Sequence, residues 1–138
     1  MLYFSYGMNT NLDQMASRCP TAKSLGMAAL PNYRFEFKRH ATVESDPGKT
    51  AYGVLWDITK RDEKSLDMLE GYPIYYNKRM VTVLHEGKQL TAMTYLMYPD
   101  ERLHMPANSY YQMLEEGYQE HGVPVSQIER ALHRALTY

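Results

Sequence analysis

The opening segment "MLYFSYGMNTNLDQMASRCP" (residues 1–20) decides the fold, because a strand, a turn and a helix follow one another within it. The apolar and aromatic run over residues 1–6 predicts a buried strand, which Gly7 ends. Capping-box spacing beyond the turn predicts a short helix that begins near Leu12 and ends at Pro20. The start of the chain is therefore expected to place a tight turn at the end of a buried strand.

This turn is the first candidate site. Backbone N–H groups at such a turn and at the following helix start point outward together, which favours a bound carboxylate or oxyanion. Gly7 allows the sharp bend and lets a ligand approach the backbone. The segment lacks the patterns of a P-loop, of a dinucleotide fold and, around Ser5, of a hydrolase nucleophile elbow. A plain strand-to-helix turn without a ligand is the alternative.

Strand and helix patterns intermix along the rest of the chain, with connections too short for crossover helices. The polar segment 41–50, which contains Pro47 and Gly48, is expected to be a mobile loop. The expected regular elements are strands at 33–40 and 51–58, a hairpin at 77–98 that turns at 86–88, and helices at about 60–70, 107–122 and 127–136. Three residue pairs have helix-capping spacing: Asn11 with Gln14, Thr59 with Asp62, and Ser126 with Glu129. We expect one α+β domain over 1–138, a small mixed β-barrel of about five to seven strands with peripheral helices.

Composition excludes several classes of function. The formal net charge is −1, which gives no attraction for nucleic acid or for an acidic membrane surface. Cys19 is the only cysteine, which rules out an intrachain disulfide and suits a reducing cytoplasm. Residues 1–7 have neither the basic region of a signal peptide nor the length of a membrane span. The five histidines are scattered without metal-ligand spacing, so neither a metal nor a cofactor is expected.

Glu70 is the second candidate, within "SLDMLEGYPIYY" (residues 65–76). Gly71 is expected to stop the helix, so Glu70 stands at a helix C-terminus, where the dipole disfavours an acid by a few tenths to ~1 kcal/mol. A carboxylate there, beside aromatic rings, should have a raised pKa, which suits a general acid and base near neutral pH. A solvated, idle glutamate at the helix end is the alternative.

Tyrosine is the third signal, with 13 tyrosines against 3 phenylalanines. Tyrosine buries like phenylalanine but keeps a polar hydroxyl, so the excess suggests a pocket or an interface. Six tyrosines stand at the edges of expected elements: Tyr75, Tyr76, Tyr95, Tyr98, Tyr110 and Tyr111. Each of them could equally be a core ring with its tip at the surface.

Taken together, these segments resemble the gamma-glutamylcyclotransferase-like family, which includes the avirulence-induced-gene-like proteins. Residues 3–20 are similar to the family's first strand and its tyrosine-glycine-serine-asparagine loop. The segment "LDMLEGYPIYYNKRMV" (66–81) is similar to its catalytic segment. The late strand and helix are matched by "MTYLMYP" (93–99) and by "PANSYYQMLEEGYQEHGVP" (106–124).

The resemblance implies a small mixed barrel that cyclises a γ-glutamyl amine or amino acid to 5-oxoproline without a metal or cofactor. It implies that Glu70 is the general acid and base. The implied substrate-binding residues are Ser5, Tyr6, Gly7, Met8, Asn9, Tyr76, Tyr95 and Tyr110. A small γ-glutamyl molecule is the expected partner, and the chain is expected to be a monomer or homodimer.

Met8 departs from the family pattern, which usually has serine there. If the turn works through backbone N–H groups, the change is tolerable, whereas a lost hydroxyl contact would alter specificity. A cyclotransferase for another γ-glutamyl conjugate and a catalytically silent binding relative are the two main alternatives, and a protein or nucleic-acid adaptor is a third. Whether Tyr75 or Tyr76 faces the pocket stays open at this stage.

Overall fold

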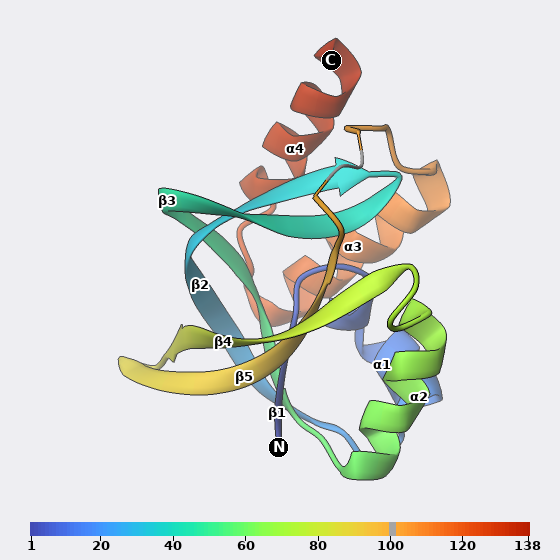
Figure 1. The fold of residues 1–138 in the computed structure, drawn as a ribbon, viewed down its shortest axis with the longest axis vertical. Helices are drawn as coiled ribbons and strands as arrows, with labels where there is room; N and C mark the ends of the chain where they lie inside the picture. Colours follow the sequence, from blue (N-terminus) through green and yellow to red (C-terminus); the bar gives the residue numbers. More distant parts are fainter. Residues whose placement is uncertain (100–101) are drawn as a thin grey trace.

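The computed structural model describes residues 1–99 and 102–138, and its centre is a closed β-barrel (Figure 1). The strands are β1 (Leu2–Ser5), β2 (Lys23–Lys38), β3 (His40–Asp57), β4 (Tyr76–His85) and β5 (Lys88–Met97), in the order β1-β3-β2-β4-β5 around the barrel. β1 pairs antiparallel with β3 and parallel with β5, so the sheet is mixed. The predicted α+β mixed barrel is confirmed, with five strands.

β1 closes the barrel, which explains its continuous apolar sequence. Its register places Phe4 opposite Leu55 of β3, and Tyr3 opposite Met93 of β5. Tyr3, Phe4 and Ser5 are all buried. Because successive side chains point to opposite faces, both faces of β1 are covered, so it lacks the alternation of a half-buried strand. The chain that leaves β1 is thereby held at one end of the barrel, where the turn at Gly7 begins.

The segment 41–50 is not a loop, which corrects the prediction made from its polar composition. It belongs to β3, and the β2–β3 hairpin reverses at Arg39, between the paired residues Lys38 and His40. Gly48 lies at an irregularity in the hairpin, where its N–H donates to Asn32 Oδ1 at 3.1 Å. The turn-forming residues lie in a bulge between two paired stretches of β3, residues 41–45 and the stretch from Thr50 onward, so pairing with β2 on both sides outweighs their loop preference. β2 also begins ten residues before the expected strand.

In the described part of the chain, four α-helices surround the barrel: α1 (Leu12–Arg18), α2 (Lys60–Glu70), α3 (Asn108–His121) and α4 (Ser126–Thr137). Two of the predicted caps are confirmed, since the Asn11 side chain accepts from the Gln14 N–H and Thr59 forms a capping box with Asp62. The third is wrong, because Val125 is the N-cap of α4 and no side chain caps that helix. Pro124 and Val125 already form the first turn through their carbonyls, so Ser126 lies inside the helix.

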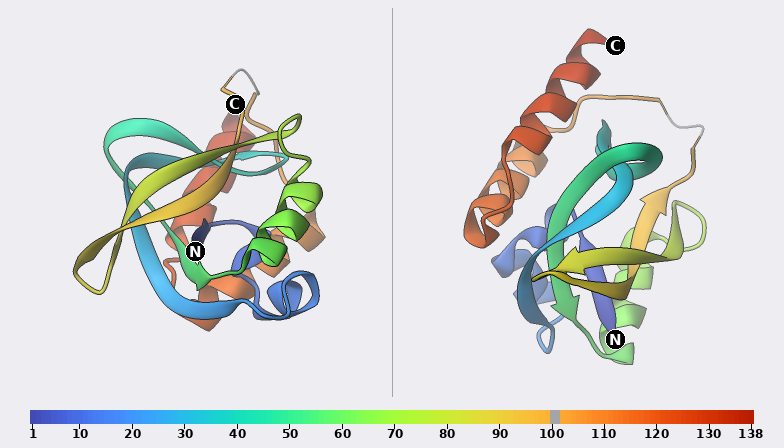
Figure 2. Two further views of the ribbon diagram at one scale, coloured as in Figure 1. Left: turned by 60° about the horizontal axis from the view of Figure 1, so that its bottom comes forward. Right: turned by 90° about the vertical axis from the view of Figure 1, so that its left-hand side faces the viewer.

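A short 3-10 helix, η1 (Met8–Thr10), connects β1 to α1. The right-hand view of Figure 2 shows α3 and α4 along one side of the barrel. α3 packs against η1 at Gly117, where an added Cβ would lie 2.4 Å from Thr10 Oγ1. The Tyr118 hydroxyl donates to the Tyr6 carbonyl at 2.6 Å. The turn after β1 is thus held from behind by a helix that the sequence places more than 100 residues later.

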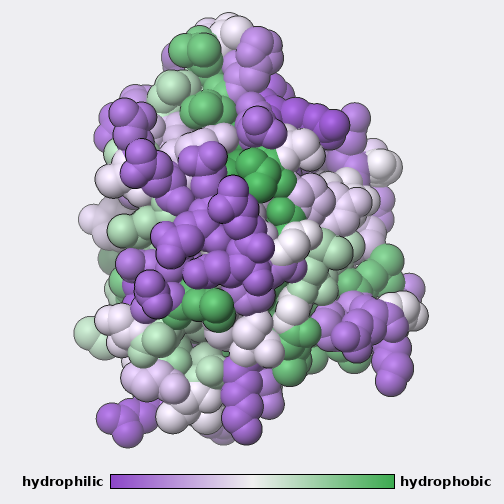
Figure 3. Space-filling model, turned by 180° about the vertical axis from the view of Figure 1, so that it is seen from behind, coloured by the Kyte–Doolittle hydropathy of each residue, from purple (hydrophilic) through white to green (hydrophobic). Residues whose placement is uncertain are grey.

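Polar side chains cover most of the face that Figure 3 presents, opposite to the view of Figure 1. In the part of the chain that the structure describes, no helix is both long enough and apolar enough to cross a membrane.

Candidate active site

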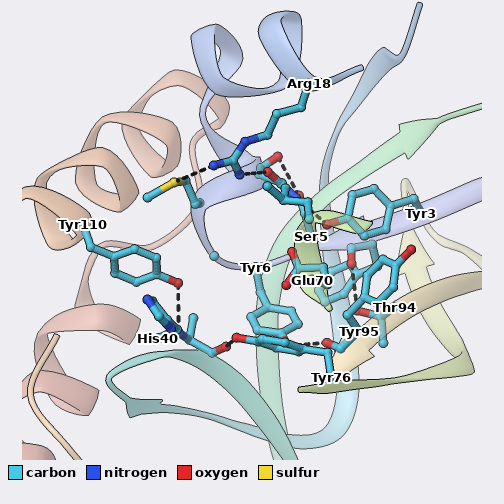
Figure 4. Close-up of a pocket in the computed structure, with 16 residues that line it drawn as sticks. Tyr3, Ser5, Tyr6, Arg18, His40, Glu70, Tyr76, Thr94, Tyr95 and Tyr110 are labelled. Atoms are coloured by element: carbon cyan, nitrogen blue, oxygen red, sulfur yellow. Dashed lines mark hydrogen bonds between the residues drawn. The ribbon is translucent and has the colours of Figure 1, made fainter. Parts of the chain in front are cut away.

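A pocket of about 320 Å³ opens where β1 runs into η1 (Figure 4). Its walls are formed by the turn after β1, the end of α2, and aromatic side chains from β1, β4, β5 and α3. The pocket brings together all of the residues that the sequence singled out for the site: Ser5, Tyr6, Gly7, Met8, Asn9, Glu70, Tyr76, Tyr95 and Tyr110. Residues far apart in sequence, from β1, α2, β4, β5 and α3, therefore face one small volume.

The turn offers free backbone donors to this pocket. Among the described residues, no acceptor bonds the N–H groups of Gly7, Met8 and Asn9, as is usual at a helix start. The Ser5 hydroxyl donates to the Asn9 carbonyl and accepts from Trp56 Nε1, each at 3.0 Å, so it braces the turn from inside. A Cβ at Gly7 would lie 3.1 Å from the Ala41 Cβ. Glycine therefore keeps the floor of the pocket open.

Glu70 is the last residue of α2, and its position follows from the helix stop. Gly71 has φ +63°, and the N–H groups of Gly71 and Tyr72 bond the carbonyls of Met68 and Asp67 in a Schellman arrangement. The half-buried Glu70 carboxyl points into the pocket (Figure 4). Burial raises its pKa to about 7, and the Arg18 guanidinium opposes this shift. Glu70 is therefore close to half-ionised at neutral pH.

Buried and half-buried tyrosines surround this carboxyl. Four of them interact electrostatically with Glu70: Tyr3, Tyr6, Tyr76 and Tyr110. Burial raises the pKa of each, and the Glu70 charge adds to the rise, so these hydroxyls stay protonated and can donate hydrogen bonds. The geometry also separates the neighbouring pair, because Tyr76 lines the pocket whereas Tyr75 is 75% exposed.

Two of these hydroxyls fix the wall of the pocket at Ala41. The Tyr76 hydroxyl donates to the Ala41 carbonyl, and the Ala41 N–H donates to the Tyr110 hydroxyl, each at 2.9 Å. Tyr110 therefore keeps its own O–H free to donate to a ligand.

The Tyr95 hydroxyl differs from these two because it bonds a charged side chain. It donates to Asp67, whose carboxylate also pairs with Lys78 at 2.9 Å. Tyr95 presents its ring to the pocket and packs edge-on against Tyr3, with 5.9 Å between ring centroids. Asp67 lies one turn before Glu70 on α2, so this network also anchors the end of that helix.

Arg18 is the pocket residue of most chemical interest that sequence reasoning missed. It ends α1, where a basic residue is ordinary because it interacts favourably with the helix dipole, so no signal marked it. Its guanidinium lies beside the turn, with Nη1 donating to Asn9 Oδ1 at 2.7 Å and Nη2 to Met8 Sδ at 3.3 Å. His40 was also missed, and its ring packs edge-on against Tyr110.

No group of three or more histidine, cysteine, aspartate or glutamate side chains within residues 1–99 and 102–138 is placed to hold a metal ion. The chemistry available in the pocket is proton transfer by one carboxyl, hydrogen bonding by backbone and phenol groups, and attraction of an anion by Arg18.

Replacing Tyr110 by phenylalanine should raise KM roughly 3- to 10-fold with little change in kcat, because a pocket hydroxyl that donates to a ligand is lost. Steady-state kinetics test this prediction. Tyr111→Phe is the matched control, since that ring neighbours Tyr110 on α3 but packs against Phe37 outside the pocket. An unchanged KM for Tyr110→Phe would remove this hydroxyl from ligand binding.

Gly71→Ala should lower the free energy of unfolding by about 1–2 kcal/mol, because alanine is strained at positive φ. The new Cβ would also lie 2.4 Å from Tyr75 Cδ2, which should move the loop after Glu70. Gly87→Ala is the control, since Gly87 has φ +77° with nothing within 4 Å of its added Cβ. Urea unfolding of both variants measures the difference, and equal losses would show that the contact with Tyr75 has no effect.

Comparisons with known proteins identify the family of this chain. A family model described as "Gamma-glutamyl cyclotransferase, AIG2-like" matches residues 3–121. Human gamma-glutamylcyclotransferase is 29% identical over 143 residues, which cover 94% of this chain and 76% of the human protein. The bovine gamma-glutamylcyclotransferase is 28% identical and covers 90% of this chain and 73% of its own.

A solved structure named gamma-glutamyl cyclotransferase superposes with a TM-score of 0.86 at 28% identity, covering 95% of this chain and 85% of its own. Sequence and fold thus agree over nearly the whole length, from β1 to the end of α3. The chain belongs to the gamma-glutamyl cyclotransferase, AIG2-like family.

Proposed function

We propose that this protein cyclises a γ-glutamyl amine or γ-glutamyl amino acid to 5-oxoproline and releases the amine. The observation that carries the proposal is Glu70, a carboxyl with a pKa of about 7 in a small pocket that also holds the free N–H groups of the turn. A group whose pKa lies near the working pH can both accept and donate a proton efficiently. The matching relatives named gamma-glutamylcyclotransferase support the same chemistry.

In the proposed first step, the substrate carboxylate binds at the turn, and the neutral α-amino group attacks the γ-carbonyl carbon of the same molecule, which closes a five-membered ring. As this bond forms, ionised Glu70 takes one proton from the attacking nitrogen. Because both groups belong to one substrate, holding it in a bent conformation supplies much of the rate. Backbone N–H groups stabilise the oxyanion that forms, a contribution of about 3–4 kcal/mol per donor in other enzymes.

In the second step, Glu70 returns the proton to the leaving nitrogen, and the bond from that nitrogen to the γ-carbon breaks. The products are 5-oxoproline and a free amine, and Glu70 is ionised again. The neutral hydroxyl of Tyr110 can donate to the substrate, and that of Tyr76, whose proton goes to the Ala41 carbonyl, can accept from it. Neither competes for the proton, because burial keeps both protonated.

Release of 5-oxoproline from a panel of γ-glutamyl amino acids and γ-glutamyl amines tests the proposal. We expect turnover with at least one member of the panel. If ligands raise the melting temperature but no product forms, the protein is a binding module that has kept the pocket.

Met8 favours a second candidate function, in which the same reaction takes place on another substrate. That substrate would be a different γ-glutamyl conjugate, such as a γ-glutamyl amine on a protein or carrier. The side chain at this position contacts Arg18 and lines the pocket, so a change there alters the surface that a substrate meets. Comparing small amines with larger conjugates in the same assay separates the two candidate functions.

The cytoplasm remains the compartment that we expect, because the buried thiol of Cys19 is free, and burial raises its pKa to about 11.

A further inference from the structure

Arg18 is the one pocket group whose charge the proposed reaction does not yet use. Its guanidinium is tethered to the turn by two neutral acceptors, the Asn9 amide oxygen and the Met8 thioether sulfur. Neutral acceptors orient a guanidinium without cancelling its charge. Two of its five N–H groups are engaged in this way, which leaves three for another partner.

Two other cations that lie against the barrel are neutralised by carboxylates. Arg34 pairs with Glu36, Glu44 and Asp46, and Lys78 pairs with Glu63 and Asp67. By contrast, no carboxylate within residues 1–99 and 102–138 lies within 4.0 Å of the Arg18 guanidinium. Holding a half-buried cation in a pocket costs free energy, because its charge loses part of its hydration. An anionic ligand would offset this cost.

We infer that Arg18 binds the α-carboxylate of the substrate, and that the pocket therefore selects γ-glutamyl compounds in which this carboxylate is free. The planar guanidinium matches a carboxylate through two parallel hydrogen bonds, which a lysine ammonium does not reproduce. The identity of the rest of the substrate rests on the proposed function, whereas the carboxylate site rests on Arg18 and its neighbours.

This assignment also gives Met8 a role. Its sulfur is a weak acceptor, so it holds one arm of the guanidinium in place while leaving that arm able to move to a stronger, anionic acceptor. A serine at this position would carry its acceptor oxygen one bond nearer to the backbone than the methionine sulfur. Met8 thus determines the position of the guanidinium in the absence of a ligand.

The first experiment measures binding by calorimetry and needs no turnover. It compares L-5-oxoproline with 2-pyrrolidinone, which has the same lactam ring without the carboxylate. Wild-type protein should bind 5-oxoproline roughly 10- to 100-fold more tightly, and Arg18→Gln should remove this preference while leaving 2-pyrrolidinone unaffected. Arg18→Lys should keep only part of this preference, and Met8→Leu should lower the affinity for 5-oxoproline a few-fold.

Arg61→Gln is the matched control, because Arg61 is exposed on α2 and does not line the pocket. It should bind both compounds as the wild type does. Equal losses for the two compounds in Arg18→Gln would mean that Arg18 only supports the turn, and would overturn the inference. Absence of a wild-type preference for 5-oxoproline would overturn it as well.

Steady-state kinetics distinguish a binding role of Arg18 from a purely structural one. Arg18→Gln should raise KM for γ-glutamyl substrates with a free carboxylate, but at a pH well above the acid limb it should not change kcat/KM for their α-carboxamide analogues. The acid limb of the pH–rate profile should move to higher pH, because the Arg18 charge lowers the pKa of Glu70. An unmoved limb together with an unchanged carboxamide discrimination would contradict the assignment.

The two proposals can fail separately. If no γ-glutamyl compound is turned over but the Arg18-dependent preference for 5-oxoproline holds, the enzymatic function fails and the carboxylate site stands. If turnover is found and neither binding nor KM depends on Arg18, the function stands and the carboxylate site fails.

Discussion

Glu70→Gln is expected to lower kcat by roughly 10³-fold or more, the upper part of the usual range for loss of a general acid and base. Glutamine keeps the size and shape of the side chain but can neither take the proton from the α-amine nor return it to the leaving nitrogen. Because one carboxyl serves both steps in the proposed mechanism, its loss should affect each of them. The measurement is 5-oxoproline release under saturating substrate.

Two further variants make this result interpretable. Glu116→Gln introduces the same chemical change at an exposed position on α3 outside the pocket, and should retain full activity. Glu70→Asp keeps the carboxyl but withdraws it by one methylene, so intermediate activity is expected. The circular dichroism spectrum of Glu70→Gln should match that of the wild type. Full activity in Glu70→Gln would remove Glu70 from the chemistry.

The features of the fold that were predicted correctly depend on residues close to one another in the sequence. The buried β1, the helix start at Asn11 and the capping box of Thr59 with Asp62 are each encoded within a few positions. Segment 41–50 was misread because its structure depends on a partner strand, since pairing with β2 turns Pro47 and Gly48 into part of a bulged ladder. Closure of the barrel through β1 and β5 likewise has no local signature.

The residues of the candidate site also differ in whether neighbouring sequence alone could identify them. Glu70 could be singled out because an acid at a helix C-terminus is a local anomaly, and the turn because a single glycine follows a buried strand. Arg18 could not be predicted because its place in the site depends on tertiary contacts with Met8 and Asn9 and on its electrostatic effect on Glu70. The choice of Tyr76 over Tyr75 also needed the structure, since adjacent residues look alike in sequence.

Glu70 should also be costly to the stability of the fold. Its pKa is about 7 in the folded protein and near 4.5 without the burial, so the folded state binds more protons between these values. Stability therefore falls as pH rises through this window, and the full penalty is present above pH 7. One pKa unit corresponds to about 1.4 kcal/mol, so the carboxylate is expected to cost roughly 1–3 kcal/mol at pH 8.

Glu70→Gln should accordingly be more stable than the wild type by roughly 1–3 kcal/mol at pH 8, although it is inactive. The advantage should shrink below pH 7 and vanish near pH 4, where the wild-type carboxyl is protonated in the folded and unfolded states alike. Urea unfolding at pH 4, 6 and 8 measures it, and Glu116→Gln should show no such trend because Glu116 is exposed. Equal stability of Glu70→Gln and wild type at pH 8 would mean that burial does not perturb this carboxyl, and the acid–base assignment would lose its physical basis.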